Sequence, residues 1–110
     1  MKLSELEPRF VRYEGASITH HSFSLAEAQG IDFLCPKCFE KNGGPVGTEH
    51  VEVTFAGRGA TDEQGSHNKD GKPTRWNVSG SGFEDLTTTP SIQLEGGCAW
   101  HGFITNGEIK

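Results

Sequence analysis

Apolar and polar side chains alternate along two stretches of the chain, a pattern typical of half-buried β-strands. Within His50–Phe55, two valines and a phenylalanine take every second position. Arg75–Val78 places Trp76 and Val78 on one face. Asn106-Gly107 is a strong hairpin signal, because a type I′ turn requires two positive φ angles. We predict strands at Ile31–Leu34, Val51–Phe55, Arg75–Val78, Pro90–Leu94 and on either side of Asn106.

The N-terminal stretch gives weaker signals. Pro8 would break a helix running through it, so we expect an irregular lead-in with an edge strand from Arg9 to Tyr13. His20 and His21 follow in a polar stretch that predicts an exposed loop. Ser24 then fits a capping box with the glutamate three positions later, which predicts a helix of one or two turns.

A long polar segment separates the two alternating stretches. Ala56–Pro73 is rich in Gly, Asp, Asn and Ser and is predicted as a mobile loop between two strands. Together, these segments predict a single domain over residues 1–110, with a lead-in containing a short helix at residues 1–30 and a β core at residues 31–110. The predicted fold class is all-β with minor α content.

Composition narrows the possible partners. Fifteen of the 110 residues are glycine, about twice the usual share of roughly 7 per cent, so seven Phe and two Trp must supply much of the core. The net charge is −5 with scattered Lys and Arg, which argues against the basic surface that nucleic acids require. No apolar run reaches the length of a membrane span, and the N-terminus is too acidic for a secretory signal. We predict a cytoplasmic protein with no nucleic-acid or membrane partner.

The strongest chemical signal is two short ligand patterns. Cys35-Pro36-Lys37-Cys38 and Cys98-Ala99-Trp100-His101 each place two ligating side chains three positions apart, so that a tight turn can direct both at one ion. Three thiolates and one imidazole form the closed set that a structural Zn²⁺ prefers. We therefore predict Cys35, Cys38, Cys98 and His101 as zinc ligands. Two alternatives are buried cysteines with an unrelated histidine, and a redox Cys35–Cys38 pair.

The two pairs lie much farther apart than the roughly 12–20 residues that separate ligand pairs in short zinc motifs. A bare zinc ribbon therefore fits poorly. A small protein of antiparallel sheets whose two ends are clamped by one zinc ion fits better, and such a cross-link would compensate for a thin core.

A second set of stretches lies around these ligands: Phe33–Cys38, the Trp76 strand, Thr89–Ile92, and Cys98–Phe103 followed by Gly107. Together they resemble a family of small phage and prophage proteins of unknown function, and the resemblance covers Ile31 to Ile109. Some members of that family carry the label ammonia monooxygenase. Copper oxidation chemistry would need an open histidine site, whereas the predicted ligands form a closed thiolate set.

A looser likeness is to β-tent zinc domains, which include B-type methionine-sulfoxide reductases and the ligand-binding domain of cereblon. This likeness implies a β-tent or zinc-ribbon-like architecture in which two distant ligand pairs clamp two antiparallel sheets. The reductases also need a reactive cysteine, and none remains here once all three cysteines bind metal.

These observations favour a non-catalytic phage-type zinc module that binds an unidentified protein or small-molecule ligand. Trp76, Phe83 and Trp100 are the candidate ligand-binding residues. The alternative is that these side chains belong to the core, which the small number of large apolar residues favours. One alternative is a small zinc-dependent enzyme with His101 as base, assisted by Glu52 or Glu95. A second alternative is an inhibitor of a host defence protein. The oligomeric state is not predicted.

Overall fold

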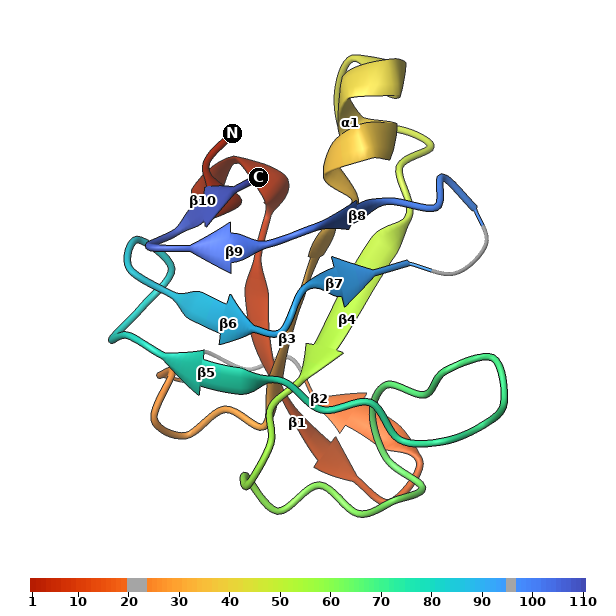
Figure 1. Ribbon diagram of the computed structural model, residues 1–110, viewed down its shortest axis with the longest axis vertical. Coiled ribbons are helices and arrows are strands. Elements are labelled where there is room, and N and C mark those ends of the chain that lie inside the picture. The colour runs from red at the N-terminus through yellow and green to blue at the C-terminus, as the bar shows by residue number, and fades with distance from the viewer. Residues whose placement is uncertain (20–23, 95–96) are drawn as a thin grey trace.

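The computed structural model describes residues 1–19, 24–94 and 97–110. Two layers of short antiparallel strands make up most of it, and the strands of one layer run across those of the other (Figure 1). One α-helix projects from the end where the layers meet. The prediction of an all-β fold with minor helix is confirmed. Within the described ranges, no helix is long and apolar enough to cross a membrane.

The first layer is a four-stranded sheet in the order β2-β1-β3-β4. The predicted strands at Ile31–Leu34 and Val51–Phe55 correspond to β3 and β4, which pair with Phe33 opposite Val51. Every residue of β3 is buried, which explains why this strand lacks the alternation of a half-buried strand. Its one charged residue, Asp32, forms an ion pair with Arg9 at 3.2 Å. The strands are β1 (Arg9–Glu14), β2 (Ser17–Thr19), β3 (Gly30–Leu34) and β4 (His50–Thr54).

The second layer consists of three strand pairs. Its members are β5 (Asn77–Ser79) with β6 (Thr87–Thr89), β7 (Ile92–Gln93) with β8 (His101–Gly102), and β9 (Ile104–Thr105) with β10 (Glu108–Ile109). The predicted hairpin is confirmed, with φ of 48° at Asn106 and 73° at Gly107. A Cβ on Gly107 would lie 2.5 Å from the Glu84 carbonyl oxygen, so glycine is required here both for its φ angle and for space.

The N-terminal residues belong to the main sheet. Strand β1 lies between β2 and β3 and is therefore not an edge strand. It follows a 3₁₀-helix, η1 (Leu3–Leu6), whose Leu3 and Leu6 are fully buried. Residues 1–14 are thus an integral part of the core, because they supply both an internal strand and two of its leucines.

The predicted short helix after Ser24 is a turn. Its capping interactions are present, since Glu27 Oε1 accepts the Ser24 backbone N–H at 2.9 Å and Ser24 Oγ accepts the Glu27 N–H at 3.3 Å. The chain turns into β3 at Gly30 before a regular helix can form. The predictions for His20, His21 and Glu95 fall on residues outside the described ranges.

The first ligand pair opens a helix that sequence reasoning did not predict. Helix α1 (Pro36–Asn42) begins after Cys35, whose Sγ accepts the Cys38 N–H at 3.5 Å. Proline is well suited to the first helical position because its missing N–H would be unpaired there. Gly43 ends the helix at φ 70°. The bend at Cys35 is therefore a helix N-terminus and not the isolated tight turn expected from the motif.

The long segment between β4 and β5 is free of strands, as predicted, but hydrogen bonds from Arg75 hold it in place. The Arg75 guanidinium donates to the carbonyl oxygens of Thr61, Gln64 and Ser66 at 2.7–3.0 Å. These contacts fold the segment back onto the start of β5, where it forms one wall of a cleft described below.

Candidate active site and cysteine cluster

Strands β7 and β8 bring a serine and a histidine together. Gln93 lies opposite His101 and Ile92 opposite Gly102. Because side chains alternate along a strand, Ile92 and Gly102 face the core and are buried, whereas Gln93 and His101 are exposed. Ser91, two residues before Gln93, lies on the same outer face as His101.

On that face the Ser91 hydroxyl oxygen lies 2.9 Å from His101 Nε2. Ser91 is half-buried and His101 is exposed. The Ser91 carbonyl accepts a hydrogen bond from the indole N–H of Trp76 at 3.1 Å, which fixes the backbone of the serine. The Phe103 ring, 48% exposed, lies 6.5 Å from the imidazole centre. Within the described ranges, no carboxylate hydrogen-bonds to His101, so the arrangement there is a pair and not a triad.

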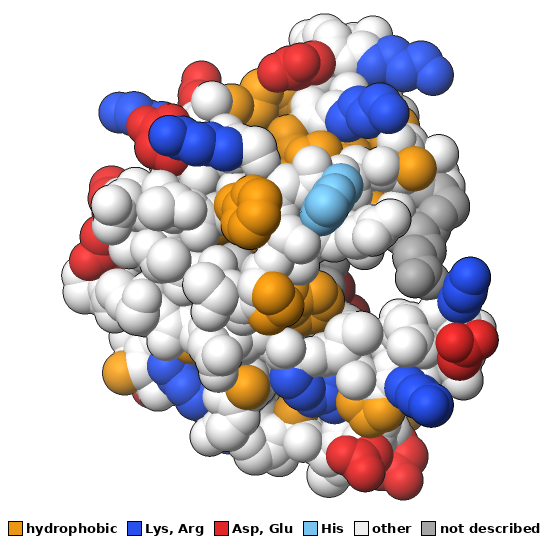
Figure 2. Space-filling model, viewed as in Figure 1, with side chains coloured by type: hydrophobic (Ala, Val, Ile, Leu, Met, Phe, Trp, Pro, Cys, Tyr) orange, Lys and Arg blue, Asp and Glu red, His pale blue; other side chains and the backbone are white. Residues whose placement is uncertain are grey.

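A cleft of about 430 Å³ runs along β7, within the range of about 300–1,000 Å³ common for ligand sites. Figure 2 shows the corresponding hollow in this face of the molecule. Its lining comes from β7 and its flanks, from β4, and from the segment that Arg75 holds in place. Besides Ser91, the lining includes Pro90, Gln93, Leu94, Trp76 and His67.

Glu52 gives the cleft a fixed acidic group. The Tyr13 hydroxyl lies 3.0 Å from Glu52 Oε2, to which it donates, and 2.8 Å from Thr54 Oγ1. Burial raises the pKa of Tyr13 well above its usual range, so the hydroxyl keeps its proton and continues to donate. The carboxylate predicted as an assistant to His101 is thus held by Tyr13 and makes no hydrogen bond to His101.

The three predicted ligand-binding aromatics lie in three different surroundings. Trp76 is 9% exposed and lines the cleft with one edge. Trp100, 8% exposed, meets Phe33 edge-on at 6.1 Å between ring centres. Phe83 stacks on Phe10 at 4.4 Å. Both tryptophans belong to the hydrophobic core, and of the three only Trp76 lines the cleft.

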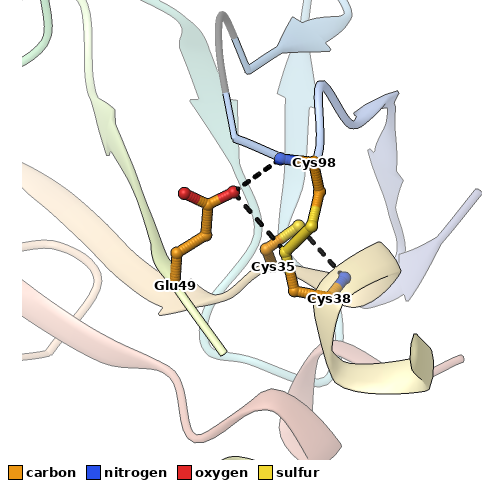
Figure 3. A group of neighbouring side chains, drawn as sticks. All are labelled: Cys35, Cys38, Glu49 and Cys98. Carbon is orange, nitrogen blue, oxygen red and sulfur yellow. Dashed lines mark hydrogen bonds between the residues drawn. A yellow bond between two sulfur atoms is a disulfide. The ribbon is translucent and has the colours of Figure 1, made fainter. Parts of the chain in front are cut away.

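The cysteines form a second site at the other end of this strand pair. The sulfurs of Cys35, Cys38 and Cys98 and a carboxylate oxygen of Glu49 all lie within 4.8 Å of one another (Figure 3). Thiolates and carboxylates are zinc ligand types, so the cluster could bind a metal ion. Glu49, just before β4, points into the group and accepts the Cys98 N–H at 3.0 Å.

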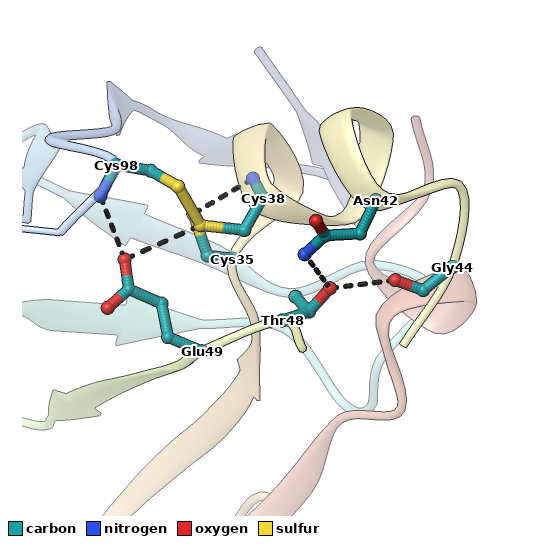
Figure 4. The surroundings of a disulfide bond; sticks show 7 residues. All are labelled: Cys35, Cys38, Asn42, Gly44, Thr48, Glu49 and Cys98. Carbon is teal, nitrogen blue, oxygen red and sulfur yellow. Dashed lines mark hydrogen bonds between the residues drawn. A yellow bond between two sulfur atoms is a disulfide. The ribbon is translucent and has the colours of Figure 1, made fainter. Parts of the chain in front are cut away.

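In the state described, Cys38 and Cys98 form a disulfide, and Cys35 is a buried free thiol (Figure 4). The disulfide joins α1 to the segment that leads into β8. The loop between α1 and β4 is closed beside it by Thr48, whose hydroxyl donates to the Gly44 carbonyl at 2.7 Å. The predicted redox alternative paired Cys35 with Cys38, which differs from this pairing.

His101 is outside the cysteine cluster. The sequence predicted His101 as the fourth zinc ligand, paired with Cys98. The structure instead places Glu49 beside the three sulfurs and His101 beside Ser91. The physical reason is that His101 lies within β8, where alternation directs its side chain to the exposed face. Cys98 precedes β8, so its side chain is not bound to that face.

Sequence reasoning missed Ser91 and Glu49 as site residues. Ser91 was placed on a predicted strand, but no strand was predicted at His101, so nothing brought the two residues together. The Cys98–His101 spacing instead directed attention to metal binding. Glu49 carries no local signal, because it reaches the cysteines only through the pairing of β3 with β4, in which the Cys35 N–H donates to the Glu49 carbonyl at 2.8 Å.

A serine hydroxyl hydrogen-bonded to an imidazole nitrogen beside a cleft is the nucleophile–base arrangement of serine hydrolases. A family model agrees with that class: the family described as "Bacterial ubiquitination-like system serine protease (BubE)" matches residues 10–110, all but the first nine. The chain belongs to the BubE family. Searches of curated proteins and of solved structures found no match.

The family match corrects the functional prediction made from the sequence. A non-catalytic phage-type zinc-binding module is wrong, because the family is one of serine proteases. The same finding replaces the two alternatives, a zinc-dependent enzyme and an inhibitor of a host defence protein. The error arose because every candidate residue was interpreted through the metal motif. The resemblance to phage and prophage proteins stays a prediction.

Proposed function

We propose that this protein is a serine protease of a bacterial ubiquitination-like system, with Ser91 as nucleophile and His101 as general base. The observation that carries the proposal is the 2.9 Å contact between Ser91 Oγ and His101 Nε2. The cleft beside Ser91 supports it, because a substrate chain needs access to the hydroxyl. The family description supports the reaction class and the biological system.

The chemistry follows from the pair. In the tautomer with unprotonated Nε2, the Ser91 hydroxyl donates to His101. As Oγ attacks a carbonyl carbon, its proton passes to Nε2. The imidazolium then donates that proton to the leaving amine or alkoxide as the bond to it breaks, which leaves an acyl-enzyme. A water molecule next loses a proton to Nε2 and attacks the acyl carbon, and Ser91 Oγ departs with the returned proton.

Covalent labelling tests this assignment. A fluorophosphonate reacts with a serine only when an adjacent base activates the hydroxyl, so we expect a single adduct on Ser91, located by peptide mass mapping. Ser91→Ala should give no adduct, and His101→Gln should slow labelling at least about a hundredfold. An adduct on another serine, or equal labelling of the His101→Gln variant, would rule out the pair as the catalytic centre.

We also propose that Zn²⁺ is the metal of the cysteine cluster, held by Cys35, Cys38, Cys98 and Glu49 once the disulfide is reduced. A thiol reductant supplies the two electrons and two protons that convert the disulfide to two thiols and is itself oxidised to a disulfide, and the thiols lose their protons when they bind the ion. Lys37 and Lys41 line the same pocket and partly offset the charge of four anionic ligands. Because the ligands come from α1, from the residue before β4 and from the segment before β8, the ion would cross-link all three.

Metal analysis distinguishes Glu49 from His101 as the fourth ligand. Protein purified under a thiol reductant with added zinc should hold one ion per chain. Glu49→Gln should weaken zinc affinity by at least about tenfold, since even outer partners of a metal site contribute that much. His101→Gln, the matched control, should keep the affinity of the unchanged protein. The opposite result would restore the Cys₃His set predicted from the sequence.

A further inference from the structure

The outer edge of β7 carries backbone groups that face away from its partner strand. The Leu94 N–H donates to the Trp100 carbonyl at 2.7 Å, which makes Leu94 and Trp100 a hydrogen-bonded pair of the ladder. Hydrogen-bonded and non-hydrogen-bonded pairs alternate in antiparallel strands. Gln93, opposite His101, is therefore in a non-hydrogen-bonded pair, and its N–H and C=O point away from β8.

Ser91 is two residues before Gln93, so its backbone N–H and C=O also point away from β8. The Ser91 carbonyl accepts the indole N–H of Trp76, which lines the cleft, so the outward direction is toward the cleft. The cleft is lined by the consecutive residues 90–94 and by no residue of β8, so it runs along this outer edge. The backbone N–H and C=O of Gln93 thus face the cleft two residues from the nucleophile.

We propose that the substrate binds as an extended peptide strand paired with the open edge of β7 through the backbone of Gln93. This inference rests on the proposed protease function and specifies its substrate class, a flexible extended segment and not a folded surface or a small molecule. Edge-strand pairing draws its affinity from main-chain hydrogen bonds, so the segment needs free amides more than a particular sequence. Trp76 and Leu94 provide apolar contacts for its side chains.

The position of His101 sets the direction of binding. The imidazole must protonate the leaving group, and it lies on the β8 side of Ser91, with the Phe103 ring 6.5 Å from it. The leaving group therefore lies over His101 and Phe103. The acyl side of the scissile bond extends the other way, along the cleft. Strand pairing on the acyl side holds the acyl-enzyme in place after the leaving group departs.

Peptide esters test the pairing on the whole protein. The probes are the p-nitrophenyl esters of acetyl-alanine, of acetyl-tetra-alanine, and of the tetrapeptide with one internal amide N-methylated at each position in turn. We expect the tetrapeptide ester to have a kcat/KM about tenfold or more above that of the single-residue ester. N-methylation should reverse that gain at the position that pairs with Gln93 and not at its neighbours, because outward amides alternate.

A variant pair tests the enzyme side. Gln93→Pro removes the outward N–H and leaves the ladder to β8 intact, as proline is tolerated on a strand edge. Gln93→Ala keeps the N–H. We expect Gln93→Pro to hydrolyse the tetrapeptide ester at least about fivefold more slowly than Gln93→Ala, with circular dichroism checking that each is folded. If Gln93→Pro does not fold, the N-methyl series on the unchanged protein decides alone.

The outcomes separate the two proposals. Equal rates for the single-residue and tetrapeptide esters, or no effect of N-methylation, in a protein whose Ser91 is labelled by fluorophosphonate would overturn strand pairing and leave the protease assignment standing. Absence of both labelling and ester hydrolysis would overturn the protease assignment, and strand pairing with it.

Discussion

Ser91→Ala should lower kcat/KM for an activated ester by at least about a thousandfold, and His101→Gln should do the same. Loss of a positioned base alone costs typically 10²–10⁴-fold. Because the two residues act as a unit, the double variant should be no slower than the slower single variant. The measurement is steady-state hydrolysis of p-nitrophenyl acetate, with the rate in buffer subtracted.

Ser79→Ala is the matched control for this experiment. Ser79 is an exposed serine at the end of β5, so its removal tests whether any surface hydroxyl matters. We expect its kcat/KM to match that of the unchanged protein. If Ser91→Ala keeps more than about a tenth of the activity, or if the two single losses multiply in the double variant, Ser91 and His101 do not form one catalytic unit.

Trp76→Ala should lower the free energy of unfolding by about 3–5 kcal/mol, the cost of removing a buried aromatic side chain. A typical domain has only about 5–15 kcal/mol in total, so this variant should be close to unfolding at room temperature. The reason is position, since Trp76 is 9% exposed and belongs to the main core cluster. Urea denaturation followed by circular dichroism provides the measurement.

Trp76→Phe separates packing from the hydrogen bond. It keeps most of the apolar contact and removes the indole N–H that donates to the Ser91 carbonyl at 3.1 Å. We expect a smaller loss, about 0.5–1.5 kcal/mol for the hydrogen bond. A Trp76→Ala variant that lost less than about 1 kcal/mol but failed to hydrolyse the tetrapeptide ester would instead support the ligand-binding role predicted from the sequence.

The alternation of side chains was sufficient to predict much of the fold. β4 and the hairpin around Asn106 lie where the pattern indicated, because strand period and type I′ turn chemistry are local properties. β3 lies where its strand-like composition indicated, without alternation. Strand β6 was missed because its three threonines show no apolar alternation. Helix α1 was missed although Pro36 at its first position and Gly43 after its end are local helix signals. The cysteine motif took precedence over them.

The site was harder to predict, because its members meet through long-range packing. Cys35, Cys38 and Cys98 do come together, as predicted, but Glu49 joins them only because β4 pairs with β3, which places Glu49 opposite Cys35. Ser91 and His101 are ten residues apart on two strands joined by a loop whose length does not fix the register. A shift of one residue would move His101 to the buried face, so the sequence alone could not pair them.

Solvent exposure of the Ser91 and His101 side chains affects how strongly they interact with a reacting group. With His101 exposed and Ser91 only half-buried, bulk solvent hydrates the imidazole and weakens every electrostatic interaction there. A macromolecule seated over the face would expel that water and raise the strength of those interactions. Under the proposed function, a substrate seated on these two side chains would thus supply the dry surroundings for its own cleavage.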